Sequence, residues 1–359
     1  MVYIESYALS CALGKSTKSS VENIKEFTSE PSTLSDKNKY YYIDEHQEQD
    51  YYESIIKIAK EALEEANLSK EAINKIGLFI GTSSAKLPIN EALLKQTDEM
   101  LAQPNLSELS SIIMNALEIK GFNTIISTAC TASANALVQA KEMIESGLIE
   151  KALVLGIELF NELSIKGFNS FQLLSQDKIR PFDQHRDGVI LGEGVSAIVL
   201  GKRPSAFEFI GGSSLLDTLS ITSSSAQNLL NIMKRTMTKA NLAPRDISVI
   251  KAHATGTIQN DLSEAQALNE LFPNHPYIIA LKPYIGHTMG ACGTNEVVLL
   301  LEALKQNFIP KTLNFTTQSS DYPLVPLSIN SPAIKGYYLL NYLGFGGNNC
   351  CLILKYSGV

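Results

Sequence analysis

Segments of strand-like composition alternate with segments of helical periodicity, and this alternation occurs twice along the chain. In the first series, apolar runs at 76–80 and 152–157 indicate strands that are separated by helices. A second series starts near Phe207 and ends with a strand-like run at 351–354. This alternation predicts an α/β body in which helices cover mixed sheets. The sequence shows no internal repeat, so the predicted duplication rests on the order of the elements alone.

The short stretch from Lys202 to Ala206 separates the two series and is the predicted seam. At 359 residues, the chain is long enough for two domains or for one large body with a duplicated core. We predict two halves, residues 1–203 with the candidate cysteine and residues 204–359 with the candidate histidines. Residues 31–51 are polar and tyrosine-rich without a clean period, and we expect an irregular surface segment there.

The stretch FNTIISTACTASANA, residues 122–136, places a cysteine where a strand turns into a helix. Phe122 to Ile126 indicates a buried strand, and the small residues around Cys130 indicate a tight turn that opens a helix. A helix start offers free amide donors and the positive end of the helix dipole, which favour a thiolate. Cys130 is therefore a candidate nucleophile, although an isolated cysteine is more often a small buried core residue.

Two of the five histidines lie at predicted strand-to-loop junctions that are rich in small residues. They are His253 in KAHATGTIQND and His287 in KPYIGHTMGACG. Histidine is the usual proton carrier and oxyanion donor near neutral pH, and neighbouring glycines allow close approach. Each histidine alone could be structural. Together with Cys130 they favour a site.

Other residues near these motifs have two interpretations each. Lys282 is either a buried cation that orients its neighbours or a surface lysine, and Glu296 is its candidate partner. The GFGG run at 344–347 is either a turn whose Phe345 packs into the core or a flexible loop. Such a loop would gate a pocket and offer an amide to an oxyanion.

Composition limits the classes of function. The net charge of −7 argues against nucleic acid as the main partner, because neutralising phosphates needs a basic face. The five cysteines form no CxxC pair and have no histidine at zinc spacing, so neither a disulfide framework nor a structural metal is indicated. No basic leader precedes an apolar run and no apolar stretch approaches membrane-spanning length. We therefore expect a cytoplasmic protein without membrane insertion.

Five stretches occur in the order that is typical of one enzyme family, over residues 120–355. They are TACTAS with Cys130, PFDQHRDGVILGEG, HATGTIQND with His253, KPYIGHTMGACG with Lys282 and His287, and NYLGFGGNN. With these motifs the chain resembles the condensing enzymes of the thiolase fold, specifically the β-ketoacyl-(acyl carrier protein) synthases of fatty-acid and polyketide synthesis. The resemblance implies an α/β, thiolase-like fold of two similar halves, with mixed β-sheets in a layered α-β-α-β-α arrangement.

The resemblance also implies roles for the catalytic residues. Cys130 would be the nucleophile that accepts the acyl group. His253 and His287 would donate hydrogen bonds to the thioester carbonyl of the incoming malonyl group as it decarboxylates. Lys282 and Glu296 would form a supporting ion pair.

Further residues are implied around this centre. Asp261 would be a second supporting acid, and Thr255 and Thr257 would lie along the pantetheine arm. Phe345 would be the gate, and the backbone amides of Cys130 and Phe345 would form the oxyanion hole.

Neighbouring families differ in their catalytic sets. Synthases that start chains have a catalytic pattern of Cys, His and Asn, whereas this chain resembles a pattern with histidine at both the second and the third position. Thiolases carry a second catalytic cysteine near the C-terminus, but Cys350 and Cys351 lie in an apolar strand here and are interpreted as core. The resemblance is therefore to the two-histidine elongating type, which joins an acyl-enzyme to malonyl-carrier by decarboxylative Claisen condensation.

No metal and no organic cofactor is implied, because the carrier protein brings the phosphopantetheine. The expected partners are an acyl carrier protein and a second subunit, in a homodimer or in a heterodimer with another ketosynthase-like subunit. A second hypothesis is a chain-length-factor-like partner subunit. Such subunits typically lack the nucleophile, so the intact set of Cys130, His253 and His287 weighs against it.

Several departures from the family pattern indicate a divergent, shortened member. The first third is short and the loop after Ile80 reads GTSSAKL, in a region that normally shapes the dimer interface and the floor of the acyl pocket. The segment from Asp44 to Asp50 is acidic, whereas relatives usually have basic residues there that bind the acidic carrier protein. Carrier docking is therefore expected on another patch or another subunit. Ala254, Pro283 and Leu343 replace usual family residues, but none of them removes a catalytic group.

Overall fold

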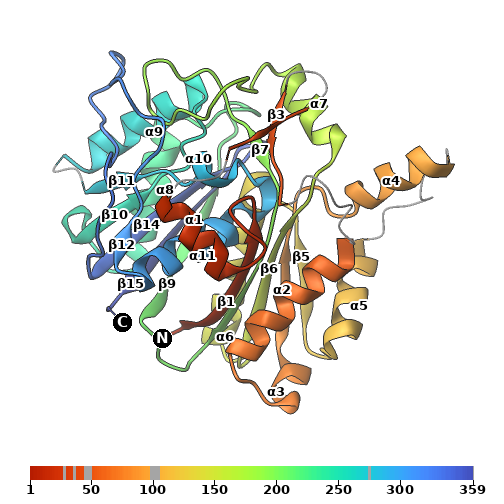
Figure 1. Cartoon of the computed structure of the whole chain (residues 1–359). Coiled ribbons are helices and arrows are strands. Elements are labelled where there is room, and N and C mark those ends of the chain that lie inside the picture. The colour runs from red at the N-terminus through yellow and green to blue at the C-terminus, as the bar shows by residue number, and fades with distance from the viewer. Residues whose placement is uncertain (27–29, 35–37, 44–50, 98–105, 274–275, 359) are drawn as a thin grey trace.

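The structure is a computed structural model that describes residues 1–358 apart from 27–29, 35–37, 44–50, 98–105 and 274–275. Its main sheet has ten strands: β1 (Tyr3–Cys11), β4 (Gly77–Gly81), β5 (Asn123–Ile126), β6 (Ala152–Glu158), β8 (Gly194–Gly201), β9 (Phe207–Leu216), β10 (Ile247–Lys251), β11 (Tyr277–Ile279), β14 (Gly336–Leu343) and β15 (Asn348–Tyr356). Their order across the sheet is β11-β10-β14-β15-β9-β1-β8-β6-β4-β5 (Figure 1).

The sheet contains the same five-strand pattern twice. From the centre outwards, β1-β8-β6-β4-β5 and β9-β15-β14-β10-β11 each have two antiparallel pairings followed by two parallel ones. Two similar halves with mixed strands are therefore confirmed. The halves are joined into one sheet, because Tyr3 of β1 pairs with Glu208 of β9. The division into domains at 203/204 stays a prediction.

Helices form the layers on either side of the strands. They are α1 (Thr17–Glu26), α2 (Tyr51–Glu65), α3 (Lys70–Lys75), α4 (Leu87–Thr97), α5 (Leu106–Leu117), α6 (Ala132–Glu145), α7 (Glu162–Ser170), α8 (Ala226–Lys239), α9 (Ile258–Leu271), α10 (Lys282–Ile285) and α11 (Cys292–Lys305). Helices α6 and α11 pack against each other between the two half-sheets, α2 and α5 cover the first half, and α8 with α9 covers the second (Figure 1). This is the expected α-β-α-β-α layering.

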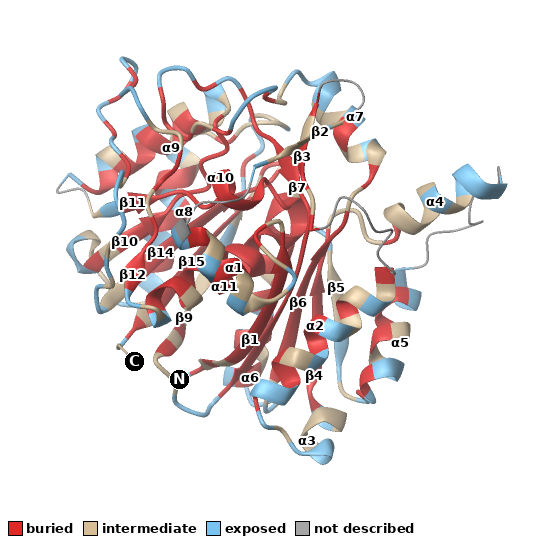
Figure 2. Cartoon of the chain, in the orientation of Figure 1, coloured by how far each residue is buried: buried red, intermediate tan, exposed pale blue. Residues whose placement is uncertain are grey.

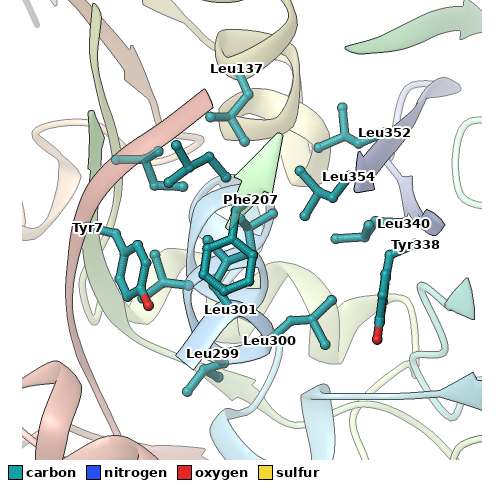
Figure 3. Packing of buried hydrophobic residues seen from close by; sticks show 14 of the residues in the cluster. Tyr7, Leu137, Phe207, Leu299, Leu300, Leu301, Tyr338, Leu340, Leu352 and Leu354 are labelled. Atoms are coloured by element: carbon teal, nitrogen blue, oxygen red, sulfur yellow. The ribbon is translucent and has the colours of Figure 1, made fainter. Parts of the chain in front are cut away.

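Helix α11, in the middle layer, is buried along almost its whole length. Strands β6 and β8 are buried along their whole length because helices cover both faces (Figure 2). Figure 3 shows Leu300 and Leu301 of α11 packed among side chains of the second half-sheet, including Phe207, Leu340 and Leu354. Burial on nearly every side of α11 fixes the position of its first turn.

The two middle helices approach each other closely at one glycine. A Cβ atom on Gly293, in the first turn of α11, would lie 2.7 Å from the Cα atom of Ala134 in α6. That distance is too short for any side chain. Glycine at this position therefore lets the beginnings of α6 and α11 come together.

Residues 31–51 differ from the expectation where they are described. They contribute β2 (Ser32–Thr33) and β3 (Lys39–Tyr41), which form a small sheet with β7 (Leu191–Gly192). Tyr40 and Tyr41 are buried, and the Tyr40 ring lies edge-on to Phe160 with centroids 5.0 Å apart. The prediction of an irregular surface segment is thus wrong here, because the tyrosine rings act as apolar core groups. The acidic run Asp44 to Asp50 lies outside the described residues.

Strand β5 is less buried than its apolar composition predicts. It has only one neighbouring strand, Asn123 is exposed, and Phe122 just before it is 42% exposed. The expectation of a buried strand is therefore wrong, since periodicity does not distinguish an edge strand from a central one.

Helix α4, near β5, extends away from the body and carries no buried residue (Figures 1 and 2). None of the helices described could span a lipid bilayer, given their length and polarity.

Two smaller kinds of element complete the secondary structure of the described residues. Strands β12 (Phe308–Ile309) and β13 (Ser331–Pro332) form a two-stranded ribbon after α11. Single 3-10 turns precede β10, at Pro244–Asp246, and the two middle helices, at Ala129–Thr131 and Met289–Ala291.

Candidate active site

Cys130 lies in the 3-10 turn η1 (Ala129–Thr131), which leads from β5 into α6. Ala129 has a left-handed backbone with φ of 50°, and this allows the chain to reverse direction sharply before the helix. The cysteine therefore precedes the α-helix by two residues instead of lying in its first turn. Its side chain is buried at 4% exposure.

His287 lies opposite Cys130, just before the second middle helix. Its Nε2 atom is 3.0 Å from the Sγ atom of Cys130. It follows the one-turn helix α10, not a strand as expected, and is followed by the 3-10 turn η3 (Met289–Ala291) that opens α11. Turns η1 and η3 are in contact, so the packing of α6 on α11 brings the thiol and the imidazole together.

His253 forms the second imidazole of the site, two residues after β10. Its ring centroid is 5.4 Å from that of His287, and the two rings are nearly perpendicular. The backbone amides of His253 and Ala254 each donate a 2.8 Å hydrogen bond to the Glu264 carboxylate, which fixes this loop. On the ring itself, Nδ1 lies 3.3 Å from the ammonium of Lys282.

A cluster of three buried charges supports the histidines. The Glu296 carboxylate accepts a 2.8 Å hydrogen bond from Lys282 and a second, short one from Lys251. Lys251 also donates to the carbonyl of Asn341 at 2.8 Å and lies 3.6 Å from the centroid of the Tyr342 ring. Lys282 is therefore a buried cation paired with Glu296, and the surface-lysine alternative is excluded.

These charges set the protonation of the two imidazoles. Burial lowers the pKa of His253 and of His287 well below the ordinary value, and the positive charges of Lys282 and Lys251 act in the same direction. Burial also disfavours the Glu296 carboxylate, but the two lysines outweigh it and keep its pKa below the usual range. Both histidines are thus neutral rings with one proton each, beside an ionised carboxylate.

The Cys130 thiol is not a resting thiolate. Burial raises its pKa to about 11, although hydrogen bonds from the backbone amides of Phe345 and Cys130 and the charge of Lys282 lower it. The loss of hydration raises the thiol pKa more than the helix start lowers it, so the thiolate expected from the helix start is not the resting form. The same two amides face the sulfur, where an oxyanion hole is implied. Loss of the thiol proton therefore needs a partner, and His287 is within reach.

Two cavities meet at Cys130. One is lined by both histidines together with Thr255 and Thr257, whereas the other is lined mainly by apolar side chains such as Leu87, Leu163 and Met289. Cys130, Phe168 and Phe345 line both cavities.

Phe345 stands between these cavities. Its ring stacks on Phe168 with centroids 5.1 Å apart and an interplanar angle of 21°. Phe171 lies edge-on to it at 6.5 Å. Phe345 is only half-buried, so the interpretation of a pure core residue does not hold. Because Phe345 lines both cavities, rotation of its ring away from Phe168 can open a passage between them.

The remaining predicted residues lie on the loop behind His253. The hydroxyls of Thr255 and Thr257 are 2.9 Å apart, and both residues line the cavity that contains the two histidines. Asp261 does not line either cavity. Its carboxylate accepts hydrogen bonds from the backbone amides of Phe182 at 2.7 Å and Gly256 at 3.2 Å, and burial raises its pKa to about 6. Asp261 therefore holds the loop in place from outside the centre.

Several residues of the site were not anticipated. Lys251 lies two residues before His253, and the two-residue period of a strand could have placed both on one face. Cys292, whose Sγ atom is 3.0 Å from Nδ1 of His287, lies four residues before Glu296 on the same helix. Glu158 accepts hydrogen bonds from the Ser83 and Gly290 amides, and nothing in its sequence context indicates this.

The other cysteines lie away from the cavities. Cys350 and Cys351 are buried in β15, as expected for core residues. Across the part of the chain that the structure describes, no three His, Cys, Asp or Glu side chains are grouped so that they could hold a metal ion.

Two models of one protein family match the chain in order. They are described as beta-ketoacyl synthase, N-terminal domain, over residues 45–206, and beta-ketoacyl synthase, C-terminal domain, over residues 212–316. Among curated relatives, 3-oxoacyl-(acyl-carrier-protein) synthase 2 of Synechocystis sp. is 29% identical over 329 residues, which cover 83% of this chain and 79% of the relative. The protein of the same name from Coxiella burnetii is 29% identical over 330 residues, with 83% and 80% covered.

Solved structures share the fold. The ishigamide ketosynthase/chain length factor superposes with a TM-score of 0.90 at 22% identity, and 99% of each chain is covered. A beta-ketoacyl synthase from Burkholderia phymatum gives a TM-score of 0.86 at 23% identity, again with 99% of each chain covered. This confirms the thiolase-like fold. The two domain models of one family match in order and together cover most of this chain. The chain therefore belongs to the β-ketoacyl synthase family and is an acyl-transferring condensing enzyme.

Proposed function

We propose that this enzyme elongates acyl chains held on an acyl carrier protein, by decarboxylative Claisen condensation with malonyl-carrier. The proposal is carried by one observation, the 3.0 Å contact between Cys130 Sγ and His287 Nε2 at the junction of the two cavities. The apolar cavity suits an acyl chain. The cavity that contains both histidines suits a pantetheine arm, because the hydroxyls of Thr255 and Thr257 lie beside it.

In the first step Cys130 becomes acylated. Its sulfur attacks the carbonyl carbon of the acyl thioester, and the bond between that carbon and the carrier sulfur breaks. The proton of the Cys130 thiol passes through His287 Nε2 to the departing carrier thiolate. The backbone amides of Cys130 and Phe345, which already face the sulfur, would bind the oxyanion of the tetrahedral intermediate.

In the second step the malonyl group loses carbon dioxide. The bond to its carboxylate carbon breaks, and the electron pair forms an enolate whose oxygen accepts hydrogen bonds from His253 and His287. Two neutral imidazoles in a buried site can donate in this way without reorganisation of water. The enolate carbon then attacks the acyl carbonyl, and the bond to Cys130 breaks to release the β-ketoacyl-carrier. The Cys130 thiolate that leaves takes up a proton from water, which restores the resting thiol.

The proposal requires no metal ion or organic cofactor, and it keeps the cytoplasmic location expected from the sequence. Its macromolecular partners are an acyl carrier protein and a second subunit of the same fold. The exposed edge of β5 and the unburied α4 support a subunit contact on that side. One structural neighbour is a type II polyketide synthase acyl carrier protein in complex with its ketosynthase, and another is a ketosynthase with its chain length factor.

A role as a chain-length-factor-like subunit is not favoured, because the nucleophile and both histidines are present and in contact. Incubation with acyl-carrier should add the mass of the acyl group to the peptide that contains Cys130, and malonyl-carrier should then yield a β-ketoacyl product. Cys130→Ala should abolish both signals, whereas Cys350→Ala, which removes a buried thiol elsewhere, should keep them. An acyl adduct that persists in Cys130→Ala would refute the proposal, as would its absence from the unmodified protein.

A further inference from the structure

The imidazole of His287 lies between two thiols. Its Nε2 atom is 3.0 Å from Cys130 Sγ, and its Nδ1 atom is 3.0 Å from the Sγ atom of Cys292. Cys292 is the first residue of α11 and has no exposed surface. It lines neither of the two cavities at Cys130, so it does not touch a substrate bound there, and its contact with the catalytic groups is the one to His287.

The two histidines differ in what faces their Nδ1 atoms. Nδ1 of His253 faces the Lys282 ammonium, which can donate a hydrogen bond but cannot accept one. The single proton of neutral His253 is therefore held on Nε2. A thiol both donates and accepts, so the partner of His287 is compatible with a proton on either ring nitrogen.

We infer that Cys292 is a positioning residue that allows His287 to use both of its neutral tautomers, while His253 stays a permanent Nε2 donor. With the proton on Nδ1, the ring donates to Cys292 and its free Nε2 accepts the Cys130 proton during acylation. With Cys292 donating to Nδ1, the proton lies on Nε2 and points toward the enolate oxygen during condensation. This inference rests on the proposed function, in which His287 serves both steps.

Two conditions for this behaviour are met. The ring must be neutral, and both burial and the nearby lysines lower the pKa of His287. The partner must keep its own proton, and burial raises the pKa of Cys292 well above the ordinary value. Exchange between the tautomers gives the Nδ1 proton to water and takes one from water on Nε2, while the Cys292 thiol changes from acceptor to donor, so the charge of the ring does not change.

Nitrogen-15 NMR of histidine-labelled protein tests the tautomers directly, without a substrate. The chain has only five histidines, and His287→Asn and His253→Asn assign the two signals. In the free protein the proton of His287 should lie on Nδ1, because Cys130 donates to Nε2. After Cys130 is capped as its methyl disulfide, the His287 proton should move to Nε2, while His253 should stay protonated on Nε2 throughout. A His287 tautomer that does not change on capping would overturn the inference.

Variants at Cys292 test the consequence for catalysis. Cys292→Ser keeps a group that both donates and accepts, whereas Cys292→Ala removes it. The alanine variant should lose about tenfold in the rates of both Cys130 acylation and malonyl decarboxylation, and serine should restore most of both. Equal losses in the two variants would indicate a purely structural role and overturn the inference. Cys350→Ala, a buried thiol remote from His287, should keep both rates.

Failure of this inference is distinguishable from failure of the proposed function. If the unmodified protein neither acylates nor condenses, the proposed function fails, and the NMR experiment still reports on the tautomers of His287. If it is active but Cys292→Ala is equally active, the proposed function stands and only the inference fails.

Discussion

The Lys282 ammonium lies 3.3 Å from Nδ1 of His253, and it shares the Glu296 carboxylate with Lys251. An ammonium has only donors, so this contact leaves the proton of neutral His253 on Nε2. The buried ion pair therefore does more than neutralise charge, because it selects the tautomer in which the imidazole can stabilise an enolate.

Replacement of Lys282 should affect decarboxylation more than acylation. Lys282→Met removes the contact to Nδ1, so His253 can place its proton on either nitrogen and donates less often. We expect the rate of carbon dioxide release from malonyl-carrier to fall about tenfold or more, with a smaller change in Cys130 acylation. Lys251→Met is the matched control, since it also removes one partner of Glu296 but does not touch His253. Equal effects of the two variants on decarboxylation would contradict this explanation.

Alkylation of Cys130 should report its raised pKa. Burial raises the pKa to about 11, so the reactive thiolate is the minor form throughout the neutral range, at about one part in a thousand at pH 8. The rate of modification by iodoacetamide should therefore keep rising with pH beyond about 9. Lys282→Met should slow it further at a given pH, because the Lys282 charge lowers the thiol pKa. A rate that reaches its plateau below about pH 8 would show that the helix start outweighs burial.

Phe345 should control access between the two cavities. Phe345→Ala removes the ring that stacks on Phe168, so we expect faster modification of Cys130 by bulky thiol reagents and acceptance of bulkier acyl groups. The cost in folding stability should be about 1 kcal/mol beyond the lost burial, as for other aromatic pairs. Phe171→Ala is the control, because that exposed ring only meets Phe345 edge-on. Unchanged selectivity in Phe345→Ala would exclude a gating role.

Glu158 should stabilise the turn η3 that follows His287 and the loop after β4. Its buried carboxylate accepts from Ser83, Ser84 and the amide of Gly290, whereas a side-chain amide in its place could accept through only one oxygen. Glu158→Gln should therefore lower the free energy of unfolding by about 2 kcal/mol, measured by urea denaturation. Glu71→Gln, which changes an exposed carboxylate paired with the exposed Lys75, should have a much smaller effect. Similar losses of stability in the two variants would argue against this role for Glu158.

Much of the fold follows from sequence periodicity. The strand predicted at 152–157 lies within β6, and the strand-like run at 351–354 lies within β15. The burial of a strand is harder to predict, because an apolar run such as β5 has the same composition at the edge of a sheet as at its centre. The burial of Tyr40 and Tyr41 was not predicted for a related reason, because their neighbours in the sequence are polar although the rings pack into the core.

The site was predictable only in part. Ordered motifs identified Cys130, His253 and His287, but their distances depend on the packing of two helices that are far apart in the sequence. The state of the Cys130 thiol could not be predicted, because it depends on how completely the fold excludes water. The contact between Cys292 and His287 likewise arises from the turn at η3, which no local pattern specifies.

The distance between Cys130 and His287 should depend on Gly293. A Cβ atom at this position would press against Ala134, so Gly293→Ala must separate the beginnings of α6 and α11. Because η1 and η3 precede these helices, a shift of a few tenths of an ångström lengthens the 3.0 Å contact of the thiol and the imidazole. We expect lower stability, by about 1–3 kcal/mol, and a loss of Cys130 acylation larger than that stability change explains. Gly167→Ala in α7 is the control, since its Cβ would meet nothing within 4 Å, and it should leave the unfolding midpoint unchanged or slightly raised. Full acylation activity in a folded Gly293→Ala variant would show that close helix packing does not set the geometry of the site.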